Sequence, residues 1–184
     1  VTVAKLASGK TVTPRVVDAL TETDFAQHIA DYVTVKNMEF VETALSETSS
    51  SSVTIDTSAQ GFKIYSHSDD KAARSVWNNA FANYKDLEST VVFDITGIMG
   101  AFDDPQMYLT SDTVIDVNEY ATFVNYMNET VKDVCGANPE TVTGETWTTA
   151  ETLFGYLSAT EKAAFKAVAA DQEGTAEQQA AARY

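Results

Sequence analysis

The feature that most constrains the fold is an apolar stripe between residues 120 and 134. Apolar side chains recur there at spacings of three and four, which gathers them on one face of an α-helix. Gly136 stands where a left-handed helix cap is common, and Pro139 prevents further helix. The stretch therefore predicts one amphipathic helix that packs against other elements.

The C-terminal part of the chain carries shorter patterns of the same kind. Leu153, Phe154 and Leu157 indicate one helix, and Phe165 with Val168 indicates the next. Residues 175–184 are rich in Ala and Gln, which favours a weakly amphipathic helix.

The N-terminal part alternates in period two, which is typical of strands. Residues 1–20 suggest two strands around a Ser8-Gly9-Lys10 turn, with Pro14 limiting the second strand. Residues 53–56 and 62–65 form the clearest predicted hairpin. Between these pairs, Phe25, Ile29, Tyr32 and Val33 fit a helix that continues towards residue 45.

The stretch 68–102 can be interpreted in two ways. Ser68 can cap a helix in which Val76, Trp77 and Phe81 face inwards, and the repeat continues through Ile95, Ile98, Met99 and Phe102. Residues 90–95 are β-branched and equally fit a buried strand. We favour the helix.

These patterns predict a mainly helical α+β protein. We expect residues 1–184 to form a single domain, with one or two β-hairpins and a helix in residues 1–67 and a helical part in residues 68–184.

The net charge of −15 disfavours nucleic acid and anionic membranes as partners, because phosphates are bound by clustered Lys and Arg. Only Arg15, Arg74 and Arg183 supply guanidinium groups. No apolar run approaches the roughly 18 residues of a membrane-spanning helix, so membrane insertion is not expected.

A single cysteine, Cys135, excludes an internal disulfide and fits the core as a small hydrophobe. The chain begins at Val1, which a removed targeting peptide or an engineered start would explain. We therefore expect an extracellular or cell-surface protein.

The stretch 111–127 resembles the second half of a calcium-binding EF-hand. Ile115 matches the apolar loop residue, Glu119 matches the glutamate that binds the ion, and Asp112 and Asp116 fall at ligand positions. A second copy aligns Trp147 and Glu151 with Ile115 and Glu119. The resemblance covers about residues 90–158 and implies calcium as a possible ligand.

Positions in both copies depart from the EF-hand pattern. Tyr108 stands where the loop needs its first Asp, and Thr113 stands where it needs Gly. In the second copy Val142 and Gly144 replace oxygen ligands. Helix capping explains the same acidic residues without an ion, because Asp116 and Glu119, Thr148 and Glu151, and Ser158 and Glu161 all have capping-box spacing. We prefer capping.

The sequence contains no motif for zinc binding, for phosphate binding or for a serine hydrolase. With His28 and His67 as the only histidines and one cysteine, no zinc-binding spacing exists. No Gly-x-x-x-x-Gly-Lys-Ser/Thr phosphate loop or Gly-x-Ser-x-Gly elbow occurs. His67 lies between Ser66 and Ser68 beside Asp69, which are hydrolase residue types without predicted geometry.

Three hypotheses follow, in order of preference. The first is a non-enzymatic structural or interaction protein that contacts other proteins, chiefly by self-association. The second is a calcium-binding module that uses Asp112, Asp116 and Glu119. The third is a hydrolase-type enzyme whose site only the fold assembles.

Overall fold

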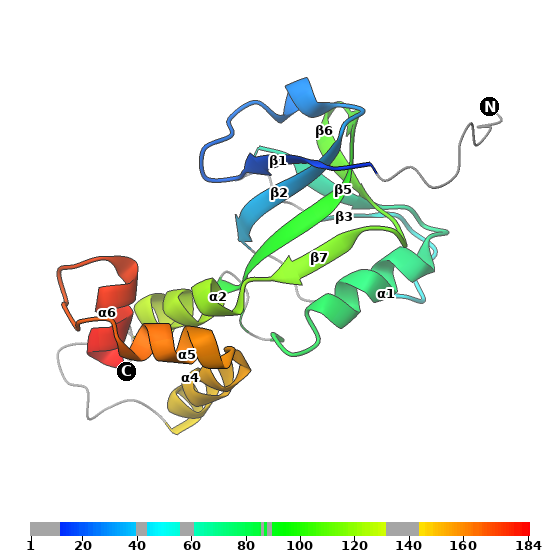
Figure 1. The fold of residues 1–184 in the computed structure, drawn as a ribbon. Coiled ribbons are helices and arrows are strands. Elements are labelled where there is room, and N and C mark those ends of the chain that lie inside the picture. The colour runs from blue at the N-terminus through cyan, green and yellow to red at the C-terminus, as the bar shows by residue number, and fades with distance from the viewer. Residues whose placement is uncertain (1–11, 40–43, 56–60, 86, 88–89, 132–143) are drawn as a thin grey trace.

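The computed structural model describes residues 12–39, 44–55, 61–85, 87, 90–131 and 144–184 (Figure 1). Within these residues the chain forms one mixed sheet of seven strands and five α-helices. The strands are β1 (Arg15–Asp18), β2 (Tyr32–Glu39), β3 (Val53–Ile55), β4 (Lys63–Ser66), β5 (Val92–Phe102), β6 (Asp104–Leu109) and β7 (Val114–Val117). The α-helices are α1 (Lys71–Ala80), α2 (Glu119–Tyr126), α4 (Gly144–Tyr156), α5 (Ala159–Lys166) and α6 (Ala176–Arg183).

The prediction of a mainly helical α+β protein is therefore wrong: the fold is α/β, organised on a mixed sheet. The largest error concerns β5, which we assigned to a helix. Ile95, Ile98, Met99 and Phe102 fit helical spacing, but Ile95 and Met99 are buried whereas Ile98 and Phe102 are exposed. A strand with apolar residues on both faces imitates a helical repeat, because alternation in period two is then hidden.

Strand β5 is the longest strand and has three neighbours. Strand β2 pairs antiparallel with one of its edges, from Tyr32 opposite Ile98 to Glu39 opposite Val92. The other edge pairs first with β7, at residues 93–96, and then with β6, at residues 98–102. Strand β1 adds parallel to β2, β4 adds parallel to β6, and β3 completes the order β1-β2-β5-β6-β4-β3.

Helix α1 covers the inner face of this sheet, because its apolar side chains meet those of β5. The ring centroids of Trp77 and Phe81 lie 4.8 Å apart, and Phe81 lies 5.0 Å from Phe93 of β5. All three rings are buried. Alternate residues of β5, such as Ile95 and Met99, extend the same core, so the inner face holds most of the apolar interior.

The predicted helix from residue 21 towards residue 45 is also wrong as far as Glu39, and residues 40–43 of it lie outside the described residues. A short 3₁₀ helix, η1 (Phe25–His28), is followed by strand β2. Val33, Val35 and Met38 of β2 are buried, and the register shifts between Val35 and Met38. This bulge moves Met38 back onto the inner face, which strict alternation would not do.

The predicted hairpin of residues 53–65 is confirmed. Strands β3 and β4 pair antiparallel, with Thr54 opposite Tyr65. The predicted strands around Ser8-Gly9-Lys10 lie mostly outside the described residues. Strand β1 begins directly after Pro14, as an edge strand.

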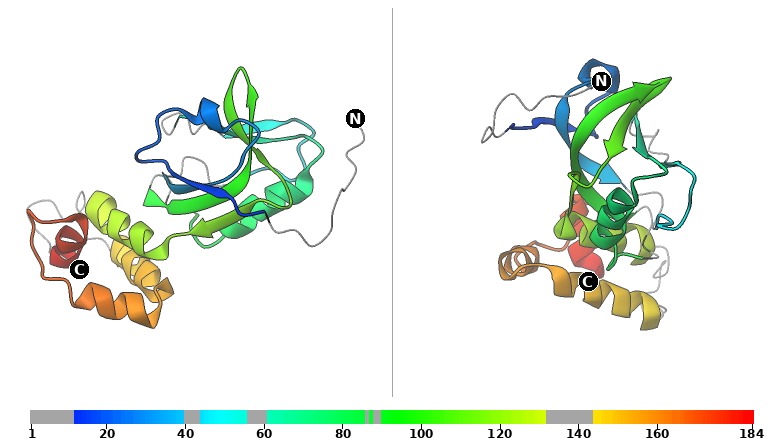
Figure 2. Two further views of the ribbon diagram at one scale, coloured as in Figure 1. Left: turned by 45° about the horizontal axis from the view of Figure 1, so that its top comes forward. Right: turned by 90° about the vertical axis from the view of Figure 1, so that its right-hand side faces the viewer.

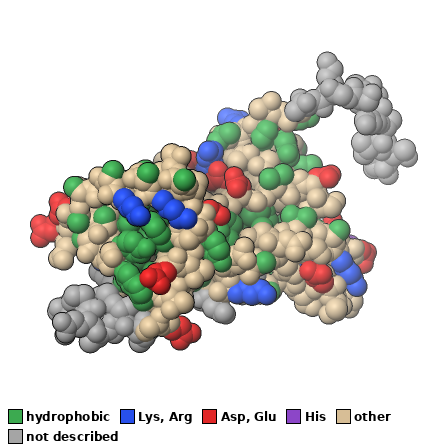
Figure 3. Space-filling view, turned by 60° about the horizontal axis from the view of Figure 1, so that its bottom comes forward, with side chains coloured by type: hydrophobic (Ala, Val, Ile, Leu, Met, Phe, Trp, Pro, Cys, Tyr) green, Lys and Arg blue, Asp and Glu red, His purple; other side chains and the backbone are tan. Residues whose placement is uncertain are grey.

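Helices α2, α4, α5 and α6 gather beyond one end of the sheet (Figures 1 and 2). Helix α2 continues into a π-helical turn, Met127–Val131, so the predicted amphipathic helix is confirmed as far as Val131. The ring centroid of Phe123 lies 5.4, 4.9 and 5.5 Å from those of Phe154, Phe165 and Tyr184. Hydrophobic side chains gather over these helices, beside basic side chains (Figure 3). Cys135, Gly136 and Pro139 lie outside the described residues.

The helix caps differ in part from the predicted ones. Ser158 and Glu161 form the expected capping box at α5. Asn118 rather than Asp116 caps α2, and Asp70 rather than Ser68 caps α1. Thr148 lies inside α4 and donates to the carbonyl of Gly144, so it caps nothing. A second capping box, Thr175 with Gln178, begins α6.

Hydrogen bonds join the helices to the sheet where β7 ends. The Asn118 N–H donates to the carbonyl of Val92 at 2.8 Å, and the Val92 N–H donates to the Thr122 hydroxyl at 3.0 Å. The start of α2 is therefore fixed to the start of β5. Among the helices in the described ranges, none is long and apolar enough to cross a membrane.

Arg74 of α1 is fully buried and organises the Ser-rich loop that precedes β3. Its guanidinium donates to the carbonyls of Ser46, Ser49 and Ser51, at 2.6, 3.2 and 2.6 Å, and to the Ser66 hydroxyl at 3.2 Å. Acceptors of this kind replace the water that a buried cation loses. The loop, which the sequence indicated only as a polar tip, is held from inside by Arg74, and Asn78 of α1 also bonds its first residues, Leu45 and Glu47.

We expect Arg74→Met to lower the free energy of unfolding by about 3 kcal/mol, because it removes the donor that the carbonyls of Ser46, Ser49 and Ser51 share. Urea denaturation measures this change. Arg15→Met is the control: Arg15 is exposed and contacts Asp31 at 3.8 Å, so its loss should cost under about 0.5 kcal/mol. Equal costs for the two variants would contradict the proposed role of Arg74.

We expect Ser158→Ala to cost about 1 kcal/mol at pH 7. The Ser158 hydroxyl and then its N–H lower the pKa of Glu161. A carboxyl whose folded pKa is lowered stabilises the fold at neutral pH and loses this effect as pH falls through that pKa. The cost should therefore shrink at pH 3.

Denaturation of both forms at pH 7 and pH 3 measures this change. Thr175→Ala is the matched control, since its partner Gln178 does not titrate in this range. Its cost should be nearly the same at both pH values. A pH-independent cost for Ser158→Ala would exclude the Glu161 contribution.

Candidate ligand-binding face

The outer face of the sheet, opposite α1, carries the side chains that alternate with the buried ones. In β5 these are Asp94, Thr96, Ile98, Gly100 and Phe102. Phe102 is 78% exposed and Ile98 is 54% exposed, although both lie in or at the end of the central strand. Large apolar residues exposed on one face of a sheet are typical of a binding surface.

Strand register arranges this face in rows that cross the sheet. One row is Val16, Thr34, Thr96 and Val114, on β1, β2, β5 and β7. The next row crosses five strands and is mainly aromatic or aliphatic: Tyr32, Ile98, Tyr108, Tyr65 and Thr54. The hydroxyls of Thr34 and Thr96 bond each other at 2.7 Å. Neither row contains a charged residue.

Gly100 allows the ring of Tyr108 to lie against the sheet. A Cβ atom on Gly100 would lie 2.1 Å from Cε2 of Tyr108, so the ring occupies the space of that side chain. Strand glycines often mark such close approaches. One side of the Tyr108 ring is therefore covered by β5, while the residue remains 36% exposed.

Tyr65 stands almost at a right angle to Tyr108. The ring centroids lie 5.9 Å apart with an interplanar angle of 84°, and the Tyr65 hydroxyl donates to the Ser52 hydroxyl at 3.0 Å. A hollow of about 530 Å³ opens beside the two rings, within the size range of small-molecule sites. Phe102, Gln106 and the ion pair of Lys63 with Asp104 also line it.

The outer face becomes charged towards the helices. Asp94 of β5 lies directly opposite Asp116 of β7, an arrangement of like charges that destabilises a sheet unless it is compensated. Lys36 Nζ lies 3.7 Å from Asp94, and the N–H of Asn37 donates to Asp94 at 3.1 Å. These contacts offset the repulsion.

Two of the three residues predicted to bind calcium meet at this end. Asp116 and Glu119 line one hollow of about 430 Å³, together with Asp94 and Glu161. Glu119 accepts from the Tyr84 hydroxyl at 3.5 Å, and burial, with Glu119 nearby, raises the pKa of Tyr84. Asp112 lies elsewhere, in the turn between β6 and β7.

The described residues include no group of three or more His, Cys, Asp or Glu side chains placed to hold a metal ion. Residues 111–127 form a turn, strand β7 and helix α2, so Asp116 points from a strand. Calcium binding by Asp112, Asp116 and Glu119 stays a prediction.

His67 lines the Tyr65–Tyr108 hollow but has no triad geometry. Its Nδ1 accepts from the N–H of Asp69 at 3.2 Å, and the Ser68 hydroxyl donates to Asp69 at 3.4 Å. Ser66 is buried and accepts from Arg74. In this arrangement neither Ser66 nor Ser68 is hydrogen-bonded to His67, so His67 does not activate either hydroxyl as a nucleophile.

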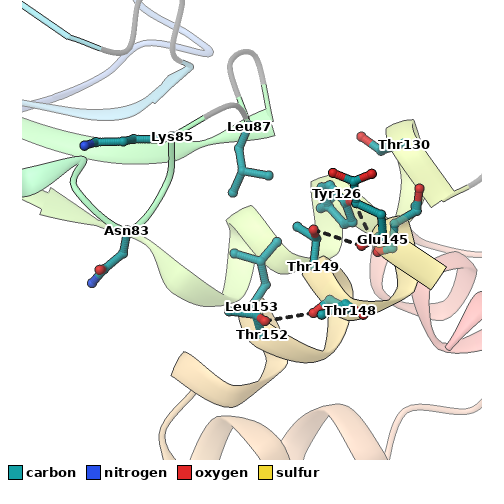
Figure 4. A pocket seen from close by; sticks show the side chains of 11 residues that line it. Asn83, Lys85, Leu87, Tyr126, Thr130, Glu145, Thr148, Thr149, Thr152 and Leu153 are labelled. Atoms are coloured by element: carbon teal, nitrogen blue, oxygen red, sulfur yellow. Dashed lines mark hydrogen bonds between the residues drawn. The ribbon is translucent and has the colours of Figure 1, made fainter. Parts of the chain in front are cut away.

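A further hollow of about 460 Å³ lies between α4 and the segment after α1 (Figure 4). Thr148, Thr149 and Thr152 line it, and each donates its hydroxyl to a carbonyl one turn earlier in α4. Tyr126 donates to the carbonyl of Thr146, and burial raises its pKa. Because these hydroxyl hydrogens are engaged within the fold, this hollow is a weaker candidate than the outer face.

No protein-family model matches the sequence, and comparisons with curated proteins and with solved structures found no significant match. The outer face was also missed by sequence reasoning. The sequence feature that could have indicated this face is the alternation of Asp94, Thr96 and Ile98 with Phe93, Ile95 and Gly97. Assigning these residues to a strand would have placed the first three on one face.

We expect Gly100→Ala to cost about 1–3 kcal/mol, because the added methyl group forces Tyr108 away from β5. In a Tyr108→Ala background the same change should be nearly neutral, since the ring is absent. Urea denaturation of the four proteins of this cycle measures the coupling.

Gly155→Ala is the control, since a Cβ atom there meets nothing within 4 Å. In helix α4 it should stabilise by about 0.5–1 kcal/mol. An equal cost of Gly100→Ala in both backgrounds would contradict the placement of the ring.

Proposed function

We propose that this protein is a non-enzymatic interaction protein that associates with further copies of itself through the outer face. The observation that carries the proposal is an exposed, charge-free apolar patch on a strongly acidic chain. The patch consists of Val16, Tyr32, Ile98 and Val114. Its three aliphatic side chains, Val16, Ile98 and Val114, are 54–59% exposed.

Charge explains why this patch suits a second copy. Two chains of net charge −15 repel each other, and this repulsion is smallest where the surfaces that meet carry few acidic groups. Thr34 and Thr96 lie between Val16 and Val114, and their hydroxyls bond each other, while one acidic residue, Asp112, lies beside Tyr32 and Ile98. Desolvating such a surface costs little, and its apolar area favours association.

A hollow borders the patch and includes one acidic residue, Asp112. Val12, Tyr32 and Ile98 line this hollow of about 510 Å³ with Gly97, Thr110 and Asp112. An exposed apolar side chain of a neighbouring copy, such as Val114, fits the chemistry of that hollow. We place such an assembly outside the cell or at its surface, where the acidic composition favours solubility.

We expect light scattering to show a concentration-dependent rise in mass for the wild-type protein. Ile98→Asp should remain monomeric, because it places a carboxylate at the centre of the patch. Leu20→Asp is the matched control: Leu20 is 72% exposed but lies outside the strands, so this variant should associate like the wild type.

A wild-type protein that stays monomeric at millimolar concentration would refute self-association. Equal association of the wild type and Ile98→Asp would refute the assigned surface.

A further inference from the structure

The corner made by Tyr65 and Tyr108 differs in chemistry from the apolar patch. The apolar side chains that line its hollow are all aromatic: Tyr65, Phe102 and Tyr108. The hollow beside the patch instead has two aliphatic side chains, Val12 and Ile98, and one aromatic ring, Tyr32. The outer face therefore carries two surfaces, and the aromatic one needs a ligand with flat apolar faces.

The two rings are fixed before any ligand arrives. Tyr108 is held against Gly100, and Tyr65 is held at 84° to it by packing and by its bond to Ser52. The Tyr108 ring lies over Gly100 with its other side uncovered by β5, and the Tyr65 ring stands beside it, nearly perpendicular. Rings that are already ordered lose little conformational entropy on binding.

The polar groups of the hollow both donate and accept hydrogen bonds. Lys63 and the Gln106 amide can donate, whereas Asp104, Gln106 and Thr54 can accept. A polyol needs such a mixture, because each hydroxyl donates one hydrogen bond and accepts others. Its ring C–H groups meanwhile pack on an aromatic face.

The charges of the hollow disfavour an anionic ligand. Asp103 and Asp104 disfavour phosphate and carboxylate groups, so nucleotides and nucleic acids do not suit it. A quaternary ammonium ion would meet the aromatic rings and the Asp103 carboxylate, but it has no hydroxyl groups to bond Lys63, Gln106 and Thr54.

We propose that the Tyr65–Tyr108 corner binds a sugar ring of an uncharged glycan, with Tyr108 as the stacking platform. Lys63, Asp104 and Gln106 bond the hydroxyls of that sugar. Ile98 lies directly opposite Tyr108 in the sheet, so the two surfaces adjoin, but their hollows share no lining residue and can be tested with variants of different residues.

The test is affinity electrophoresis of the full chain in gels that contain a neutral β-glucan, an α-glucan, a mannan or a xylan, followed by calorimetric titration with the matching oligosaccharide. At least one polysaccharide should retard the wild-type protein. Tyr108→Ala should weaken binding about tenfold or more, the effect of one lost stacking contact. Tyr108→Phe should retain most of the binding, since it preserves the ring.

Tyr32→Ala is the matched control, because Tyr32 shares the outer face but lies outside the hollow. It should bind glycan like the wild type. Circular dichroism checks that each variant is folded, and Lys63→Met offers a second variant that leaves both rings in place and should also weaken binding.

Three results would overturn the proposal: no retardation by any of the four polysaccharides, unchanged binding by both Tyr108→Ala and Lys63→Met, or displacement of the oligosaccharide by tetramethylammonium at equal concentration. None of these bears on self-association, which Ile98→Asp tests. Loss of self-association in Ile98→Asp with glycan binding intact would support the two surfaces as separate sites.

Discussion

The architecture depends on the hydrogen bonding of one strand to three others. Strand β5 pairs with β2 along one edge, and with β7 and β6 in succession along the other. Because side chains alternate along a strand, this pairing also decides which residues face α1 and which face solvent. A slip of one residue in β5 would exchange Ile95 for Thr96 in the core.

Packing around β5 also positions side chains on the outer face. Tyr108 takes its position because Gly100 has no side chain, and Tyr65 takes its position because Ser52 accepts its hydroxyl hydrogen. Ser52 in turn follows the loop that Arg74 holds from beneath the sheet. A buried cation on the inner side thus supports the aromatic corner on the outer side, through the Ser-rich loop.

Charge is distributed unevenly over the same face, and this distribution separates the two uses that we propose for it. The end near the helices carries Asp94, Asp116 and Glu119 around an acidic hollow. The middle carries the uncharged rows of Thr, Val, Ile and Tyr. The hairpin end carries aromatic rings beside the Lys63–Asp104 pair. On a chain of net charge −15, an uncharged middle is the region where another acidic copy can approach, and the mixed donors and acceptors of the hairpin end suit a neutral polyol.

By itself, the sequence determined the features that depend on local spacing: the β3–β4 hairpin, the amphipathic helix from Tyr120 to Val131, and the Ser158–Glu161 capping box. These are local because their partners lie a few residues apart. Only the tertiary structure decided that residues 92–102 are a strand and that Tyr32, Ile98, Tyr108 and Tyr65 share one row, because each of these residues comes from a different strand and pairing between distant segments leaves no local trace. The candidate site was missed for the same reason: a row across a sheet exists only once the register is set.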